Sequence, residues 1–170
     1  GKIQQIPKNS FKDCKSLSTI IFNTKKLESI ESSAFEGCDL LSELTIKTTI
    51  KAINDNAFLG IKKLRIFGDV EFIPENSFKN CFSLETIIFY TPKLVSIGKS
   101  AFEGCSSLTE ITLPSSLQVI EENVFQGIKT LAIKGEIQKI PNNSFIKCSS
   151  ITKIDIYDNK LISIDYQKEQ

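Results

Sequence analysis

One phenylalanine recurs along this chain at spacings that themselves repeat, and this feature constrains the fold most. The recurring residues are Phe11, Phe35, Phe58, Phe78, Phe102, Phe125 and Phe145. The steps between them are 24, 23, 20, 24, 23 and 20 residues, so the same three steps recur as a block. A unit of this size is too small to bury its own apolar face and must stack on its neighbours. The sequence therefore predicts a solenoid.

Each repeat places its apolar residues in a fixed frame. The segment 108–113 ends in strict apolar and polar alternation, with equivalents at 41–46, 84–89 and 151–156, which predicts a half-buried strand. The segment 33–38 opens with Ser33, a good helix N-cap, and ends just after Gly37. We therefore expect a short helix or 3-10 turn between strands, which Asn9, Asn76 and Asn143 would cap in their own repeats.

The frame resembles the BspA-type leucine-rich repeat, also called the Treponema pallidum type. The residues that carry the resemblance are Ser33 to Cys38 with Leu41 and Leu44, and Ser100 to Leu108 followed by Ile111 to Pro114. The resemblance implies an α/β repeat solenoid: a curved leucine-rich-repeat horseshoe with a parallel β-sheet on its concave face and short helix or 3-10 turns between strands. It also implies a mostly surface-exposed or secreted family associated with adhesion. A cell-surface or secreted location is expected, and a cytoplasmic one stays open.

The repeats form a single array over residues 1–170, with about seven repeats of 20–24 residues and a superperiod of 67. We expect this array to be a fragment of a longer one, because the pattern is already under way at residue 1 and the chain has no Met. The repeats marked by Phe58 and Phe125 are three residues shorter and carry Ile61 and Ile128 in place of Cys. Uneven local curvature is expected there.

The five cysteines share one slot, three residues after the marker Phe. Stacked coils would bring Cys14 near Cys38 and Cys81 near Cys105, within the distance a disulfide allows. Such side chains run parallel into a core, however, and free cysteine is among the most often buried residues. We expect free, unreactive core thiols. The nearest two are 24 residues apart, which is unlike the spacing of zinc ligands.

Several functional classes find little support in the sequence. The chain has no His, which removes the commonest general base, and it has no phosphate-binding loop motif. We therefore expect no enzyme activity, no metal and no cofactor. With 21 basic and 20 acidic side chains the net charge is +1, which does not favour nucleic acid. No apolar run reaches the length of a membrane span, so direct membrane insertion is not expected.

The outward positions of the predicted sheet offer a candidate contact surface. They would form two rows, of which the first is Ile21, Thr45, Arg65, Ile88, Thr112, Ala132 and Asp155. The second row is Thr19, Glu43, Lys63, Thr86, Glu110, Thr130 and Lys153. Repeat proteins bind through such extended surfaces. We single out as partner contacts Ile21, Thr45, Arg65, Ile88, Thr112, Glu43 and Glu110. Strand preference alone would also explain the Thr and Ile.

A second candidate surface is aromatic. Phe72, Phe82 and Tyr90 stand where the preceding block has Gln5, Lys15 and Asn23, so these positions should face solvent. Exposed aromatic side chains close together would form a contact surface. The alternative explanation for these aromatic residues is neutral sequence divergence among the copies of the repeat.

The leading hypothesis is a non-catalytic protein-protein interaction module, taking a protein or peptide ligand, of a cell-surface or secreted adhesion-type protein. The alternative is a structural spacer or self-assembling scaffold element with no dedicated ligand. Core positions exposed at an uncapped end of a solenoid would allow end-to-end self-association.

Overall fold

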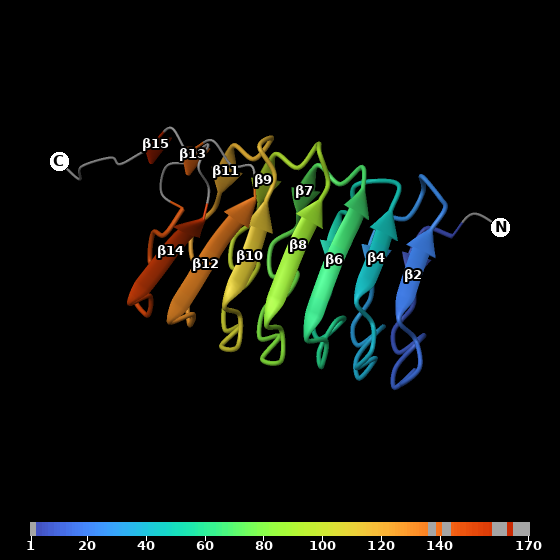
Figure 1. Ribbon diagram of the computed structural model, residues 1–170. Coiled ribbons are helices and arrows are strands. Elements are labelled where there is room, and N and C mark those ends of the chain that lie inside the picture. Colours follow the sequence, from blue (N-terminus) through green and yellow to red (C-terminus); the bar gives the residue numbers. More distant parts are fainter. Residues whose placement is uncertain (1–2, 136–138, 141–143, 158–162, 165–170) are drawn as a thin grey trace.

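Each repeat forms one coil of a parallel β-solenoid, and the coils stack in a row from one terminus to the other (Figure 1). The computed structural model describes residues 3–135, 139–140, 144–157 and 163–164. A described coil contributes one longer strand and one strand of two residues. All pairs formed between these strands are parallel, as expected for coils wound in one direction.

The longer strands form one seven-stranded sheet in chain order, here called the long sheet. Its strands are β2 (Thr19–Phe22), β4 (Glu43–Ile46), β6 (Lys63–Gly68), β8 (Thr86–Tyr90), β10 (Glu110–Leu113), β12 (Thr130–Gly135) and β14 (Lys153–Tyr157). The burial of β4 alternates strictly, with Leu44 and Ile46 buried and Glu43 and Thr45 partly exposed. The predicted half-buried strands are therefore confirmed.

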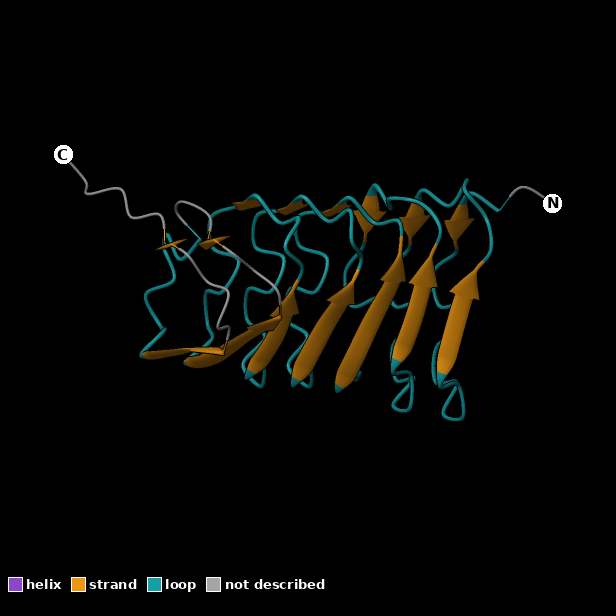
Figure 2. Ribbon diagram, turned by 45° about the horizontal axis from the view of Figure 1, so that its top comes forward, coloured by secondary structure: helices purple, strands orange, loops and turns teal. Residues whose placement is uncertain are grey.

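The two-residue strands run along the opposite side of the coils (Figure 2). They are β1 (Gln5–Ile6), β3 (Ser29–Ile30), β5 (Ala52–Ile53), β7 (Phe72–Ile73), β9 (Ser96–Ile97), β11 (Val119–Ile120), β13 (Lys139–Ile140) and β15 (Ser163–Ile164). They group as β1-β3-β5, β7-β9-β11 and β13-β15. The boundaries recur every three coils, which matches the superperiod of the sequence.

The marker phenylalanines form a continuous stack through the core. Neighbouring ring centroids lie 5.2–6.4 Å apart, and the planes of five of the six neighbouring pairs are within 27° of parallel. The five central rings, from Phe35 to Phe125, are at most 1% exposed. The predicted stacking of the repeats is thus confirmed. One core runs the length of the molecule, as a solenoid requires.

The turns that carry the phenylalanines contain no helix in the described part of the chain, so the expected short helix or 3-10 segments are absent. The amides of Ala34, Glu36 and Cys38 bond to carbonyls three residues back, whereas the alternate amides of Phe35 and Gly37 bond to the next coil. A helix would direct every amide along its own chain. Hydrogen bonds between neighbouring coils therefore take the place of the hydrogen bonds of a helix.

The described residues include no helix able to cross a membrane.

Two positions in each fully described turn take positive φ, and this corrects the expected capping role of asparagine. Asn9 and Asn76 have φ of 60° and 57°, the left-handed conformation. Asn143 lies outside the described residues. The same slot, two residues before each phenylalanine, is left-handed at Ser33, Asn56, Ser100 and Asn123. Asn tolerates this conformation better than other non-glycine residues. Asparagine therefore provides the left-handed backbone conformation that the turn requires and does not cap a helix.

The five cysteines are all free, and four are buried. The Cys38 thiol donates to the carbonyl of Phe11, and the Cys105 thiol donates to that of Phe78, both at 3.0 Å. Burial raises the pKa of Cys81 to about 12. Cys14 departs from the expected core position and is exposed, because no described coil covers the outer side of its turn.

Candidate binding surface

The outward face of the long sheet, here called the open face, carries the side chains that alternate with the core residues. On β6, Lys63 and Arg65 point outward, whereas Leu64 and Ile66 are buried. Because all seven strands are parallel and in continuous register, outward side chains on neighbouring strands form rows across the coils. The open face is therefore an extended surface of aligned side chains.

The observed rows differ from the expected ones at each short repeat. The central row is Thr19, Glu43, Arg65, Ile88, Thr112, Lys134 and Tyr157. Glu43 thus lies opposite Arg65 and not Lys63, and Thr45 lies opposite Phe67 and not Arg65. Between β10 and β12 the same change pairs Glu110 with Ala132. The two predicted rows were therefore wrong at the β4–β6 and β10–β12 junctions and correct between the other neighbouring strands.

The short repeats shift the register because their strands begin directly after the turn. In β6 the core residues Leu64 and Ile66 alternate, whereas the equivalent residues of the preceding coil, Leu41 and Leu44, are three apart. The strand β6 then continues to Gly68, which pairs with Ile46. A Cβ atom on Gly68 would lie 1.8 Å from the Ile46 carbonyl oxygen, so this pairing requires glycine.

All seven predicted contacts of the sheet lie on the open face and are at least partly exposed. Ile21 is 57% exposed on β2, while Ile88 and Thr112 lie opposite each other on β8 and β10. Whether they contact a partner stays a prediction.

The three predicted aromatic contacts do not come together. Phe72 lies on β7, Phe82 lies in the turn before β8, and Tyr90 ends β8. A strand of five residues is about 17 Å long, so Phe82 and Tyr90 lie at opposite ends of β8. No ring contact links any two of the three within the described residues. Each is exposed as expected, but the single cluster is a correction, because aligning the blocks reveals exposure and not neighbourhood.

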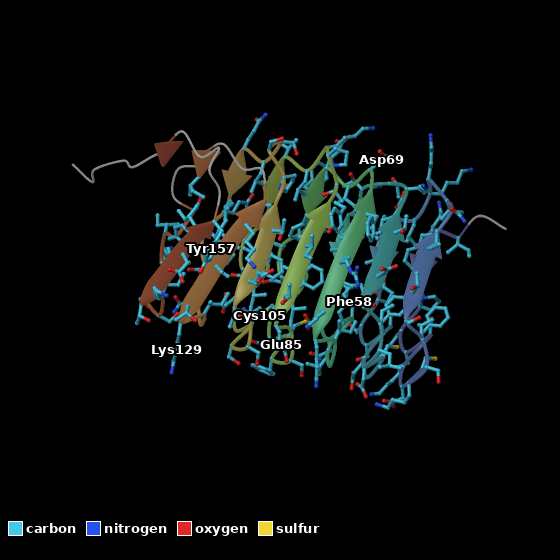
Figure 3. All side chains as sticks on the ribbon, viewed as in Figure 1. Phe58, Asp69, Glu85, Cys105, Lys129 and Tyr157 are labelled. Carbon is cyan, nitrogen blue, oxygen red and sulfur yellow. The ribbon has the colours of Figure 1, made fainter. Side chains whose placement is uncertain are left out.

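Tyr90 has a different aromatic partner, one that the sequence reasoning missed. Its ring stacks on that of Phe67, with centroids 4.8 Å apart and planes 12° from parallel. Tyr157 continues the aromatic character on β14 (Figure 3), where Lys134 lies 5.7 Å above its ring. The alternation of buried and outward residues from Leu64 to Phe67 is the signal in the sequence that indicates an outward-facing Phe67.

Ion pairs across the coils leave the open face close to electrically neutral. Arg65 lies 3.5 Å from Glu43, and Lys134 lies 2.7 Å from Glu110. On β14, Lys153 pairs with Asp155 at 2.7 Å. Exposed ion pairs of this kind contribute little to the stability of the fold. They do place both positive and negative groups on the open face, to which a partner of complementary charge pattern could bind. Within the described ranges, no three metal-ligating side chains gather in one place.

Comparison with known families agrees with this architecture. The profile of the BspA type Leucine rich repeat region matches residues 1–90 and 71–167, with six copies. The chain belongs to the BspA-type leucine-rich repeat family. No curated protein matches it significantly.

Three solved structures of leucine-rich repeat proteins are similar to this chain. The crystal structure of the T. pallidum leucine-rich repeat protein is 21% identical, with a TM-score of 0.51 over 96% of this chain and 74% of that one. A Bacteroides ovatus leucine-rich repeat protein is 17% identical, with a TM-score of 0.30 over 95% of this chain and 60% of that one. A leucine-rich cell surface protein of Faecalibacterium prausnitzii is 16% identical, with a TM-score of 0.32 over 97% of this chain and 73% of that one. At these identities, the T. pallidum protein supports the fold alone.

Proposed function

We propose that this chain is a non-catalytic protein-binding module of a surface or secreted adhesion-type protein, and that it binds through the open face of the long sheet. The observation that carries the proposal is the open face itself, seven aligned strands long, with Ile21 and Tyr90 exposed and Ile88 partly exposed between paired charges. Extended sheets of repeat proteins are typical binding surfaces, and exposed apolar side chains mark contacts. The family to which the chain belongs supports the location and the role, and leads us to expect that the open face is concave.

The proposal is tested by placing one charge on either side of the solenoid. Ile88→Asp alters the open face on β8, and Val119→Asp is the matched control, because Val119 is 45% exposed on β11. Both variants, with the unaltered chain, are measured by biolayer interferometry against a panel of soluble extracellular-matrix proteins. Binding should fall about ten-fold or more in Ile88→Asp and stay unchanged in Val119→Asp, since a buried unpaired charge costs several kcal/mol at an interface.

Two results would count against this function. Equal loss in both variants would mean that the open face is not the contact surface. Absence of binding to every matrix protein, together with a mass in light scattering that rises with concentration, would favour the self-assembling scaffold instead.

A further inference from the structure

A cavity opens where β10 ends one residue earlier than β8. The strand β10 stops at Leu113, which pairs with Gly135 at the end of β12, and is followed by Pro114, whereas β8 continues by one residue, to Tyr90. The resulting cavity has a volume of about 430 Å³. This value is within the range of small-molecule sites, roughly 300–1,000 Å³.

One wall of this cavity is an aromatic face. Phe67 on β6 stacks against one face of the Tyr90 ring. Because β8 lies between β6 and β10 in the sheet, the other face of that ring is directed toward β10 and the cavity. Pro92 and Pro114 add two further apolar rings to the lining.

The polar groups of the cavity are hydroxyls without partners. Tyr90, Thr91, Thr112 and Ser115 line it, and none of their side-chain hydroxyls bonds to another described residue. The Thr91 oxygen is buried and out of reach of a ligand in the cavity, whereas Tyr90, Thr112 and Ser115 are at least partly exposed. Exposed hydroxyls without a protein partner are free to donate and accept hydrogen bonds with a ligand. No charged side chain lines the cavity, so an ionic ligand would find no counterion.

The copy of this site one block earlier shows what distinguishes it. The hydroxyl residues there are Thr24, Thr45 and Thr48, which correspond to Thr91, Thr112 and Ser115. The ring residues, by contrast, have polar or charged counterparts: Asn23 for Tyr90, Lys25 for Pro92 and Lys47 for Pro114. The second block therefore keeps the hydroxyls and replaces an amide and two charges with ring surfaces.

We propose that the cavity binds one neutral sugar unit of a glycan. The apolar face of a pyranose ring would lie on the free face of Tyr90, and its hydroxyls would exchange hydrogen bonds with those of the protein, which both donate and accept. An apolar peptide side chain such as proline would cover the rings but leave the hydroxyls unpaired. This inference goes beyond the protein-binding proposal and does not depend on it.

Saturation-transfer NMR of the whole chain tests the proposal. The probes are the methyl glycosides of glucose, galactose, mannose and N-acetylglucosamine, with glucuronic acid, glucosamine and a triproline peptide for comparison. We expect transfer to ring protons of at least one neutral glycoside at millimolar concentration, and none to the charged sugars or the peptide. No transfer to any neutral glycoside, or stronger transfer to triproline, would overturn the proposal.

Three variants locate the binding. Tyr90→Asn installs the residue of the sister site, and Tyr157→Asn is the matched control on β14, outside the cavity lining. Affinity should fall about ten-fold or more in the first and stay unchanged in the second. Thr112→Val keeps the side-chain volume while removing one hydroxyl that is partly exposed in the cavity, and it should also weaken binding. Should Tyr90→Asn unfold, Thr112→Val decides, and unchanged affinity in either folded variant contradicts the site.

Discussion

At the scale of single residues, one position in each turn depends on backbone conformation more than on side-chain packing. Asn56 is exposed and has no side-chain hydrogen bond within the described chain, yet its φ is 59°. A left-handed conformation costs most non-glycine residues about 1–2 kcal/mol, and less for Asn. This slot in each coil is therefore sensitive to residue type although its side chain contacts little.

Asn56→Ala should accordingly lower the free energy of unfolding by about 1 kcal/mol, because alanine cannot adopt a positive φ without strain. Asn56→Gly removes the same side chain and relieves the strain, so its stability should equal or exceed that of the unaltered chain. Urea unfolding followed by circular dichroism measures both. Equal destabilisation by alanine and glycine would show that the asparagine side chain matters instead.

Among the described carboxyl groups, Glu122 has the most strongly shifted pKa. Hydrogen bonds from Lys147 and Lys99, and their charges, lower the pKa of the Glu122 carboxyl from its ordinary value of 4.5 to about 2. Since the folded value lies below the unfolded one, the stabilisation is present above pH 4.5 and is lost as the pH falls toward 2.

Lys147→Gln should therefore raise the pKa of Glu122 toward 4.5, because one of its two cationic partners is removed. Carboxyl-carbon NMR titration measures the shift directly. Lys93→Gln, which breaks the separate ion pair with Asp69, is the control and should leave Glu122 unchanged. A Glu122 titration that is the same in both variants would contradict the assignment.

At the scale of the strand, the close approach of β4 and β6 depends on Gly68. Its φ is 109°, and the backbone oxygen of Ile46 occupies the space that a Cβ would need. Gly60 also has a positive φ, 96°, but a Cβ there would meet no atom closer than 3.4 Å. Substituting each glycine by alanine therefore distinguishes the free-energy cost of a strained φ, present at both positions, from the cost of a steric clash, present only at Gly68.

Gly68→Ala should lower the free energy of unfolding by at least ~2 kcal/mol, because the new methyl must displace the β4 backbone as well as adopt a strained φ. Gly60→Ala carries only the strain and should cost less, about 1–2 kcal/mol. Chemical unfolding compares the pair. A smaller effect at Gly68 than at Gly60 would mean that β4 and β6 are less closely packed than described.

The strands were predictable from sequence, but their register across short repeats was not. Alternation at Leu44 and Ile46, and the spacing of the phenylalanines, determine which residues face the core. The register between β4 and β6 depends on where the deleted residues fall, before or after the strand, and length alone leaves this open. Helices were expected because Ser33 and Gly37 are common at helix ends; both instead serve alternating turns that pair with the next coil.

For the candidate site, likewise, the exposure of single residues was predictable from the sequence, whereas their arrangement was not. Exposure of Tyr90 followed from comparing the copies, because polar counterparts mark solvent-facing slots, and exposure of Ile21 followed from strand alternation. The stacking of Tyr90 on Phe67 and the cavity beyond it depend on the shifted register and on the early end of β10, which no single repeat reveals.

At the scale of the whole molecule, each coil contacts only the coils beside it. In the central coils, a ring such as Phe102 stacks on Phe78 and Phe125 and is fully buried, whereas Phe11 stacks on a single neighbouring marker ring, Phe35, and is only partly buried. Stability in such arrays is the sum of coil and neighbour terms, so it should be greatest in the middle.

Phe102→Ala should therefore cost about 3–5 kcal/mol through the cavity it leaves, and Phe11→Ala distinctly less. Hydrogen exchange read by mass spectrometry should show slow exchange for β6, β8 and β10, and faster exchange toward either end of the described array. Equal protection along the whole row, or equal cost at the two rings, would mean that the molecule unfolds as one indivisible unit.

The recurring boundaries of the short sheets bear on how such a protein changes length. Gly68 and Gly135 stand at equivalent places in successive blocks, and the junctions between triplets of coils are alike. If the gene segment that encodes one block of three coils were duplicated, the new block would pack on both sides against coils equivalent to those that the original block already contacts. Recombination could lengthen or shorten the protein without inventing a new junction, while each added copy leaves the older ones free to diverge in sequence.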